Sequence, residues 1–161
     1  MEDRGGAFFR GAYICGPLTE LPAEVQVAVK KFYKEIADMC KDMLGVRAFV
    51  PHEHYDPVVN ANFTPKQVNE AERKQICEKT SVLIVVAIAP SWGGGIEVEM
   101  AHQSKVPIII LCEREKLKQR KISRLLLGNP GVVKVIPYSS QKQALDSLGK
   151  FLQEFSSLFI A

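Results

Sequence analysis

The sequence predicts a doubly wound α/β fold, in which a five-stranded parallel sheet of the Rossmann or flavodoxin type carries helices on both faces. Two apolar runs, at residues 82–88 and 107–112, are rich in β-branched side chains and have the composition of strands buried on both faces. Segments with helical periodicity flank both runs, so strands and helices alternate along the chain. That alternation is typical of a parallel sheet with crossover helices.

The first part of the chain is expected to contribute two strands and a long helix. Residues 12–15 form the expected first strand, which ends before Pro17 because proline lacks the N–H that an internal strand needs. Apolar side chains at helical spacing then predict an amphipathic helix over about residues 22–45. Residues 48–50 predict a short second strand.

The middle of the chain is expected to contribute the central strand between two helices. Thr64 followed by proline matches an N-cap and a first helical residue, which predicts a helix over residues 65–79. The apolar run at residues 82–88 is the central strand. The glycines at positions 93–95 predict a turn without Cβ atoms, which lets backbone N–H groups approach a ligand and leads into a helix to about Ser104.

The last part of the chain continues the alternation. Residues 107–112 predict the fourth strand, and a polar connection at residues 113–121 leads to a short helix at about residues 123–127. Residues 132–136 predict the fifth strand, and apolar side chains between positions 144 and 155 recur at helical spacing in a final amphipathic helix.

Composition and charge limit the class of protein. A chain of 161 residues with 47% hydrophobic and 24% charged residues fits one domain, expected over residues 12–161 after a flexible N-terminus at residues 1–11. The net charge of +3 falls short of the excess expected for nucleic-acid binding and suits a small anionic substrate. A signal pattern and an apolar run long enough for a membrane are both lacking, so we expect a cytoplasmic protein without membrane contacts.

Cysteine and histidine spacing does not indicate a metal site. The four cysteines lack a Cys-x-x-Cys pair, which argues against zinc binding and against a disulfide framework. His52 and His54 form a His-x-His pair, but no third ligand is spaced to join them. We therefore expect no metal and no cofactor.

The rim formed by the carboxyl ends of the strands is the expected site, because ligands of open α/β sheets bind there. The helix after the glycines carries Glu97 and Glu99. Side chains two apart on a helix point about 200° away from each other, so only one of them can face a ligand. A carboxylate in the first helical turn is expected to be held ionised, which suits a nucleophile. The alternative is a glycine loop that only tightens the connection, with two ordinary acidic residues.

Common nucleotide-binding motifs are absent from the sequence, but two other runs resemble a known superfamily. Neither a P-loop nor a Gly-x-Gly-x-x-Gly turn after the first strand occurs. The Tyr-Ile-Cys-Gly-Pro run at residues 13–17 and the Pro-Ser-x-Gly-x-Gly-x-Glu signature at residues 90–97 resemble the nucleoside 2-deoxyribosyltransferase superfamily. The similarity covers about residues 12–155 and is greatest to the 2′-deoxynucleoside 5′-phosphate N-hydrolase branch.

The resemblance implies a role for several residues. Glu97 matches the nucleophile of the family, and Tyr13 matches the tyrosine that orients it. Positions that hold a 5′-phosphate in the hydrolase branch match Ser91 and Gly93, and Ser123 looks like a serine that a neighbouring subunit contributes. A homodimer with composite active sites follows from this match. The expected substrate-binding set is Gly16, Ser91, Gly93, Gly95, Ser123 and Arg73.

The loop after the second strand is expected to supply further catalytic groups. Glu53 and His54 are similar to a Glu-His pair near the substrate in the hydrolase branch, and His54 or Asp56 is expected to assist the leaving base or the water. The sequence departs from the family at Arg73, where an aspartate is expected and where arginine cannot donate a proton usefully. Either Glu72 is the true equivalent after a one-residue shift, or Asp56 or His54 substitutes, or the base preference differs.

The predicted activity is an N-glycosidase acting on nucleoside 5′-monophosphates, with a small nucleotide as its only ligand. Two alternatives stay open from the sequence. A deoxyribosyltransferase would pass the sugar to a second base. A nucleotide-binding sensor would keep the pocket without turnover, and Arg73 is the residue that favours it.

Overall fold

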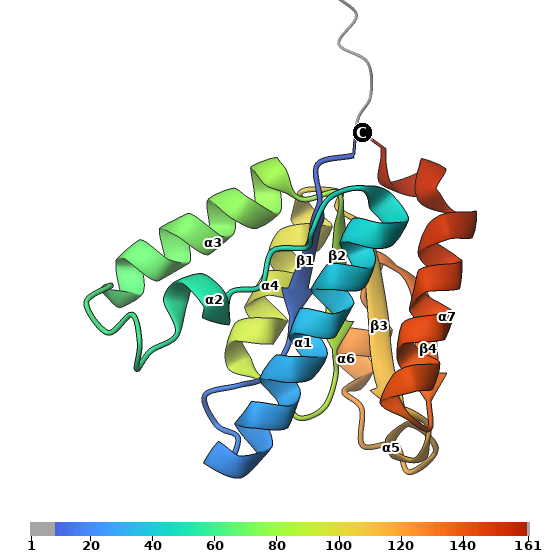
Figure 1. The fold of residues 1–161 in the computed structure, drawn as a ribbon, viewed down its shortest axis with the longest axis horizontal. Coiled ribbons are helices and arrows are strands. Elements are labelled where there is room, and N and C mark those ends of the chain that lie inside the picture. The colour runs from blue at the N-terminus through green and yellow to red at the C-terminus, as the bar shows by residue number, and fades with distance from the viewer. Residues whose placement is uncertain (1–8, 161) are drawn as a thin grey trace, which may run out of the picture.

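A four-stranded parallel sheet lies between two layers of helices in the computed structural model, which describes residues 9–160 (Figure 1). The strands are β1 (Ala12–Cys15), β2 (Val82–Val86), β3 (Ile108–Glu113) and β4 (Val132–Tyr138). Their spatial order is β1-β2-β3-β4, and every neighbouring pair is parallel. All carboxyl ends therefore meet at one edge of the sheet, where the sequence places the glycine segment.

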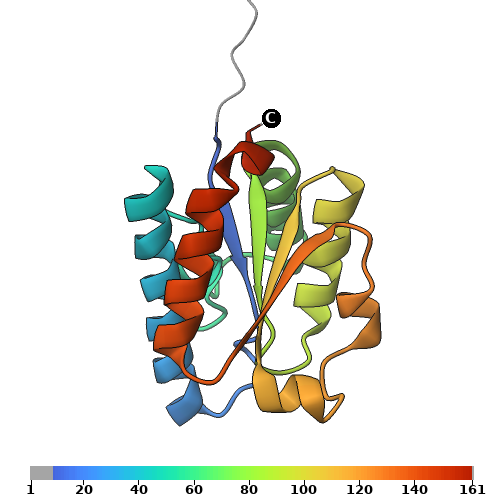
Figure 2. The same cartoon turned by 90° about the vertical axis from the view of Figure 1, so that its right-hand side faces the viewer.

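Helices cover both faces of the sheet, as predicted. Figure 2 shows α1 (Ala23–Leu44) and α7 (Gln141–Glu154) on one side and α4 (Trp92–Gln103) on the other. Helix α3 (Pro65–Lys79) packs against α4. The shorter elements are α2 (His52–Tyr55), α5 (Arg114–Lys118), α6 (Arg124–Leu127) and a 3₁₀ turn at Ser156–Phe159. None of the helices within residues 9–160 is long and apolar enough to cross a membrane.

Alternate residues of each strand enter different cores, because successive strand side chains point to opposite faces. Ile14 and Ile84 belong to the core under α1 and α7. Tyr13 and Cys15 belong to the core under α3 and α4, together with Leu83. The strand β1 therefore presents its tyrosine and its cysteine to the helix that follows the glycine segment.

The prediction of a five-stranded sheet was wrong, because the expected strand at residues 48–50 contributes a single bridge. Phe49 lies beside β1, where its N–H donates to the Ala12 oxygen at 2.8 Å and its oxygen accepts from Ile14 at 2.9 Å. The next N–H able to extend this ladder belongs to position 51, which is a proline. Pro51 has no N–H to donate, so the pairing stops after one residue.

The glycine segment also differs from the prediction, because it lies inside helix α4 rather than in a turn before it. Ser91 is the N-cap, and its side-chain oxygen accepts from the Gly94 N–H at 3.1 Å. Positive φ angles among glycines of residues 9–160 occur only at Gly11 and Gly45, so positions 93–95 use ordinary helical backbone. Glu97 consequently lies in the second turn of α4, beyond the first-turn position expected for it.

Other boundaries agree closely with the sequence. Helix α3 begins and ends where predicted, and its N-terminus carries a capping box between Thr64 and Gln67. Two segments expected to be loops contain short helices, α2 and α5. At the N-terminus the structure describes only part of the segment expected to be flexible: the Arg10 N–H donates to Ser81 Oγ, while residues 1–8 lie outside the described region.

Candidate active site

A cleft of about 310 Å³ opens beyond the carboxyl ends of β1 and β2. Its walls come from the loop after β1, from α1, from the segment around α2, from α3 and from the start of α4. The elements are distant in sequence but meet here because the strands are parallel. The predicted residues that line the cleft are Gly16, Asp56, Ser91, Gly93 and Glu97.

Glu97 and Tyr13 form a buried hydrogen-bonded pair. The Tyr13 hydroxyl donates to Glu97 Oε1 at 2.8 Å, and the tyrosine is fully buried while the glutamate is 9% exposed. Burial raises the pKa of Glu97, and hydrogen bonds donated by Cys15 and Tyr13 oppose part of that rise. The helix N-terminus is not what sets the ionisation of Glu97, because the carboxylate lies one turn too far along α4.

Glu99 points away from the cleft. Its side chain accepts from Gln103 at 2.7 Å and from Asn129 at 3.1 Å on an exposed surface. The prediction that only one of the two glutamates on α4 faces the cleft is therefore confirmed by their positions.

A second carboxylate, that of Glu72, enters the cleft from α3. It is half-buried, and desolvation together with the negative charge of Glu97 raises its pKa to about 7. Arg73 is exposed and does not line the cleft. Neighbouring residues on a helix point about 100° apart, so α3 can turn only one of them inward. Of the alternatives that the sequence left open, the one-residue shift to Glu72 is the one that agrees with this geometry.

The segment around α2 distributes its polar residues differently from the expectation. His52 lines the cleft, and burial lowers its pKa. His54 is exposed and stacks on Phe49, with ring centroids 4.5 Å apart. Glu53 pairs with Arg47 through two hydrogen bonds of 2.7 and 2.8 Å. The histidine that reaches the cleft is thus not the one that the sequence favoured.

Asp56 lines the cleft but is engaged by protein groups. It accepts from Lys30 at 2.7 Å and from the N–H groups of Val58 and Val59 at 2.9 and 3.1 Å. These bonds lower its pKa to about 2. An acid that stays ionised at neutral pH cannot protonate a leaving base, so the contacts of Asp56 favour an anchoring role over a catalytic one.

The N-terminus of α4 forms another part of the cleft wall. Ser91 and Gly93 both line the cleft there, whereas Gly95 does not and donates its N–H to the Ser91 oxygen. Across the cleft, the Tyr33 hydroxyl donates to the Pro17 oxygen at 2.7 Å. A Cβ at Gly16 would lie 2.3 Å from that hydroxyl, so only glycine fits beside Tyr33.

Ser123 lies outside the cleft of its own chain. It is the N-cap of α6 and exposed, and its Oγ accepts from the Leu126 N–H at 3.4 Å. Two large apolar side chains are also exposed. Leu125, two residues after Ser123, is 89% exposed, and Trp92, at the start of α4, is 93% exposed.

No role was predicted for Tyr33 or Tyr55, and His52 received less weight than His54. All of Tyr33, Tyr55 and His52 line the cleft. A signal for Tyr33 was present. It lies on the apolar face of the helix between Phe32 and Ile36, where a phenol needs a hydrogen-bond partner. For Tyr55 and His52, loop position alone carried no comparable signal.

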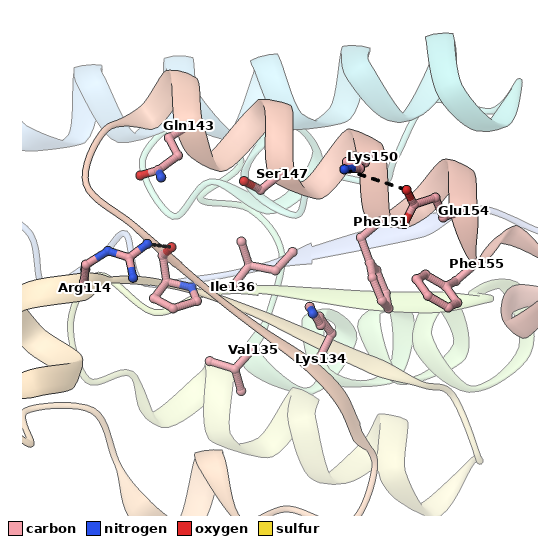
Figure 3. Close-up of a pocket in the computed structure, with 11 residues that line it drawn as sticks. Arg114, Lys134, Val135, Ile136, Gln143, Ser147, Lys150, Phe151, Glu154 and Phe155 are labelled. Atoms are coloured by element: carbon pink, nitrogen blue, oxygen red, sulfur yellow. Dashed lines mark hydrogen bonds and ion pairs between the residues drawn. The ribbon is translucent and has the colours of Figure 1, made fainter.

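A larger groove of about 360 Å³ lies between β4 and α7 (Figure 3). Figure 3 shows Lys150 paired with Glu154. The Arg114 guanidinium donates to the Pro137 oxygen at 3.1 Å. The single carboxylate of this groove is therefore already paired at the surface. The smaller cleft is the better candidate, because it alone of the two joins two carboxylates with perturbed pKa values.

Within residues 9–160, no three His, Cys, Asp or Glu side chains gather closely enough to hold a metal ion. The side chains that line the cleft present carboxyl, phenol and imidazole groups.

Comparisons with known proteins were made at the level of sequence and of structure. No protein-family model matches the chain, and no match was found among curated proteins. Among solved structures, the CMP N-glycosidase BcmB of Clostridium botulinum has a TM-score of 0.62 at 21% identity, covering 88% of this chain and 98% of BcmB. BlsM has a TM-score of 0.64 at 19% identity, covering 92% of each chain.

A third similar structure is a conserved protein from Enterococcus faecalis V583, with a TM-score of 0.58 at 13% identity, covering 89% of this chain and 99% of that one. At such identities a structural likeness establishes a shared fold. These likenesses show that the chain shares its α/β fold with BcmB and BlsM.

Proposed function

We propose that the protein is a nucleoside 5′-monophosphate N-glycosidase in which Glu97 is the nucleophile and Glu72 the general acid. The observation that carries this proposal is that two carboxylates with raised pKa values, those of Glu72 and Glu97, line one cleft. Two such groups are what base release needs, since one must attack as an anion and the other must donate a proton. The name of BcmB, a CMP N-glycosidase of the same fold, supports the reaction class.

The surroundings of each glutamate support this division of roles. Burial raises the pKa of Glu97, and the hydrogen bond that it accepts from the Tyr13 hydroxyl at 2.8 Å opposes part of that rise and favours the ionised form. For Glu72, desolvation and the charge of Glu97 both favour the protonated form. We propose that a proton shared by the two carboxyls resides on Glu72, because the charge of Glu97 adds to desolvation there.

The first chemical step joins Glu97 to the sugar. A carboxylate oxygen of Glu97 attacks C1′, the bond between C1′ and the base nitrogen breaks, and the base takes the proton of Glu72. In the second step, water gives a proton to Glu72 and attacks C1′, and the bond between C1′ and the Glu97 oxygen breaks. The products are free base and sugar 5-phosphate, with both glutamates restored.

The N-terminus of α4 is the proposed phosphate end of the cleft. Unpaired backbone N–H groups in the first turn of a helix bind anions, and Gly93 presents no side chain there. The net charge of +3 also favours an anionic substrate. The base would then lie on the side of Glu72, near the aromatic residues Tyr55 and Tyr33.

The proposal is tested by incubating the purified protein with ribo- and deoxyribonucleoside 5′-monophosphates and following free base by chromatography. We expect base release from at least one monophosphate. A parallel reaction with a second free base distinguishes hydrolysis from transfer, because a transferase would form a new nucleotide. If the protein bound monophosphates without releasing base from any of them, a sensor would replace the proposed enzyme.

The matched variants Glu97→Gln and Glu99→Gln test the nucleophile. We expect Glu97→Gln to lower kcat by about 10³-fold or more while nucleotide binding stays within about tenfold, because the amide keeps the shape but cannot attack. Glu99→Gln should retain activity, since its side chain lies on the exposed side of α4. The opposite pattern would show that Glu99 is the nucleophile and that the proposed site is wrong.

A further inference from the structure

The hydroxyl of Tyr33 joins helix α1 to the loop that follows β1. It donates to the Pro17 oxygen at 2.7 Å, and the tyrosine is only 3% exposed. Pro17 is also buried and lies two residues beyond the last residue of β1, where the chain leaves the sheet. Because a buried hydroxyl and a buried carbonyl each need a partner, this contact fixes the start of the loop.

The loop also packs closely against the ring of Tyr33. A Cβ at Gly16 would lie 2.3 Å from the Tyr33 hydroxyl oxygen and 2.8 Å from Cζ, so the backbone of Gly16 touches the phenol. At the far end of the loop, the Leu21 N–H donates to the Leu18 oxygen at 3.0 Å. The segment is thus held at its start by Tyr33 and at its end by a turn.

The segment that Tyr33 holds is a wall of the proposed active site. Every residue from Gly16 to Glu20 lines the cleft, and so does Tyr33 itself. His52, which lines the cleft from α2, has its ring centroid 6.0 Å from that of Tyr33. One phenol therefore lies beside two segments that are distant in sequence and that both face the ligand space.

We propose that Tyr33 is a positioning residue for substrate binding: its hydroxyl holds residues 16–20 in the conformation that accepts the nucleotide, so that binding does not have to order them. This inference rests on the proposed function, because it takes the cleft as the nucleotide site. A wall that is ordered before the ligand arrives loses less entropy on binding, so the ligand binds more tightly.

The state of the phenol agrees with a positioning role. Burial raises the pKa of Tyr33 above its usual value, so the hydroxyl keeps its proton at neutral pH. That single proton is directed to the Pro17 oxygen, so it is not available to Glu97 or to a leaving base. Loss of the hydroxyl should therefore weaken substrate binding and leave the chemical step intact.

Tyr138 provides a matched control for a buried tyrosine. It belongs to the same core under α1 and α7, and it does not line the cleft. Tyr138→Phe therefore removes a hydroxyl from that core without touching the loop. Gly16→Ala disturbs the contact with Tyr33 from the loop side. The test compares wild type, Tyr33→Phe, Gly16→Ala and Tyr138→Phe.

The first measurement is kcat and KM for base release. We expect Tyr33→Phe to raise KM about tenfold with kcat within about twofold, because one buried hydrogen bond to the loop is lost. Gly16→Ala should also raise KM, since its methyl group would push the loop away from the ring. Tyr138→Phe should keep both values. A purely structural loss would act differently: fewer folded molecules lower the apparent kcat, while the KM of the folded ones stays unchanged.

Hydrogen exchange measured by mass spectrometry reports the loop without relying on activity. We expect faster exchange over residues 16–21 in Tyr33→Phe and Gly16→Ala, and wild-type exchange there in Tyr138→Phe. An unchanged KM or an unchanged loop exchange in Tyr33→Phe would overturn the inference. If that variant does not fold, Gly16→Ala decides by the same two measurements.

The proposed function can fail separately from this inference. A wild-type protein that binds a nucleoside monophosphate but releases no base refutes the proposed enzyme. The affinity for that monophosphate, measured by calorimetry, then replaces KM in the same comparison of variants. Equal affinity in wild type and Tyr33→Phe would overturn the positioning role.

Discussion

Two adjacent residues of α3 lie in different environments, and the proposed general acid depends on this difference. Glu72 enters the cleft, whereas Arg73 lies in solvent. Ile76, four residues after Glu72, is fully buried, so the same face of α3 that packs against the core also presents the glutamate. The ionisation of Glu72 follows from this placement, because burial and Glu97 together raise its pKa to about 7.

The pH dependence of activity should report Glu72. A general acid works only while protonated, so activity should fall as pH rises through about 7. We expect Glu72→Gln to remove this alkaline limb and to lower kcat by about 10²–10⁴-fold. Arg73→Gln, one position away, should leave both unchanged. The measurement is kcat/KM for base release between pH 5 and pH 9; an alkaline limb that persists in Glu72→Gln would assign the acid to another group.

At the scale of elements, the first turn of α4 contains glycines that packing alone does not explain. A Cβ added at Gly93 or at Gly95 meets no atom within 4 Å, so packing requires glycine at neither position. Glycine inside a helix costs about 0.5–1 kcal/mol relative to alanine. Of these two glycines, Gly93 lines the cleft and Gly95 does not. We propose that the cost is kept at Gly93 because a substrate phosphate approaches it.

Alanine substitution separates these two glycines. Gly93→Ala and Gly95→Ala should each raise the free energy of unfolding by about 0.5–1 kcal/mol, as measured by urea denaturation. Only Gly93→Ala should reduce the preference for a monophosphate over its nucleoside, by about tenfold or more, because its methyl group occupies the phosphate end of the cleft. If wild type and Gly93→Ala preferred the monophosphate over the nucleoside equally, the substrate phosphate would not bind at the N-terminus of α4.

The junction of α1 with the segment after α2 depends on Asp56. Its folded pKa of about 2 lies below the unfolded value of about 3.9, so the ionised form stabilises the fold. That stability is present above about pH 4 and is lost as pH falls toward 2. The salt bridge to Lys30 and two backbone N–H bonds are its physical source.

Replacement of this aspartate tests the anchoring role. We expect Asp56→Asn to lower the free energy of unfolding by about 1–2 kcal/mol at pH 7, and the difference from wild type to shrink as pH falls below 4. Asp146→Asn, on the exposed face of α7, serves as the control. Urea denaturation at pH 7 and pH 3 measures both. A difference that is independent of pH would exclude the ionised carboxylate as the cause.

At the scale of the whole molecule, Ser123 raises the question of assembly. It is exposed and outside its own cleft, although the family resemblance assigns its position to a phosphate site. Leu125 and Trp92 are large apolar side chains that a partner subunit would bury. A homodimer in which Ser123 completes the cleft of the partner is therefore our proposal for the assembled protein.

Mixing two inactive variants tests this assembly. Ser123→Ala and Glu97→Gln should each be impaired, and exchange of subunits should restore up to about half the wild-type activity per heterodimer. One site of the heterodimer then carries both defects and the other carries none. The measurement is base release after mixing, with subunit exchange verified by mass spectrometry. Exchange without recovery would place Ser123 within its own chain or outside the site.

The chain pattern alone determined the alternation of strands and helices and which of the two glutamates of α4 faces the cleft. The cap signal of Thr64 followed by proline located α3, and helical spacing separated Glu97 from Glu99. The tertiary structure decided what depends on packing between distant segments. It turned Glu72 rather than Arg73 inward because Ile76 fixes the rotation of α3, and it ended the pairing of Phe49 at Pro51. The tertiary structure also decided the pKa shifts of Glu72 and Glu97, because their carboxyl groups lose water only when the fold brings them into one cleft.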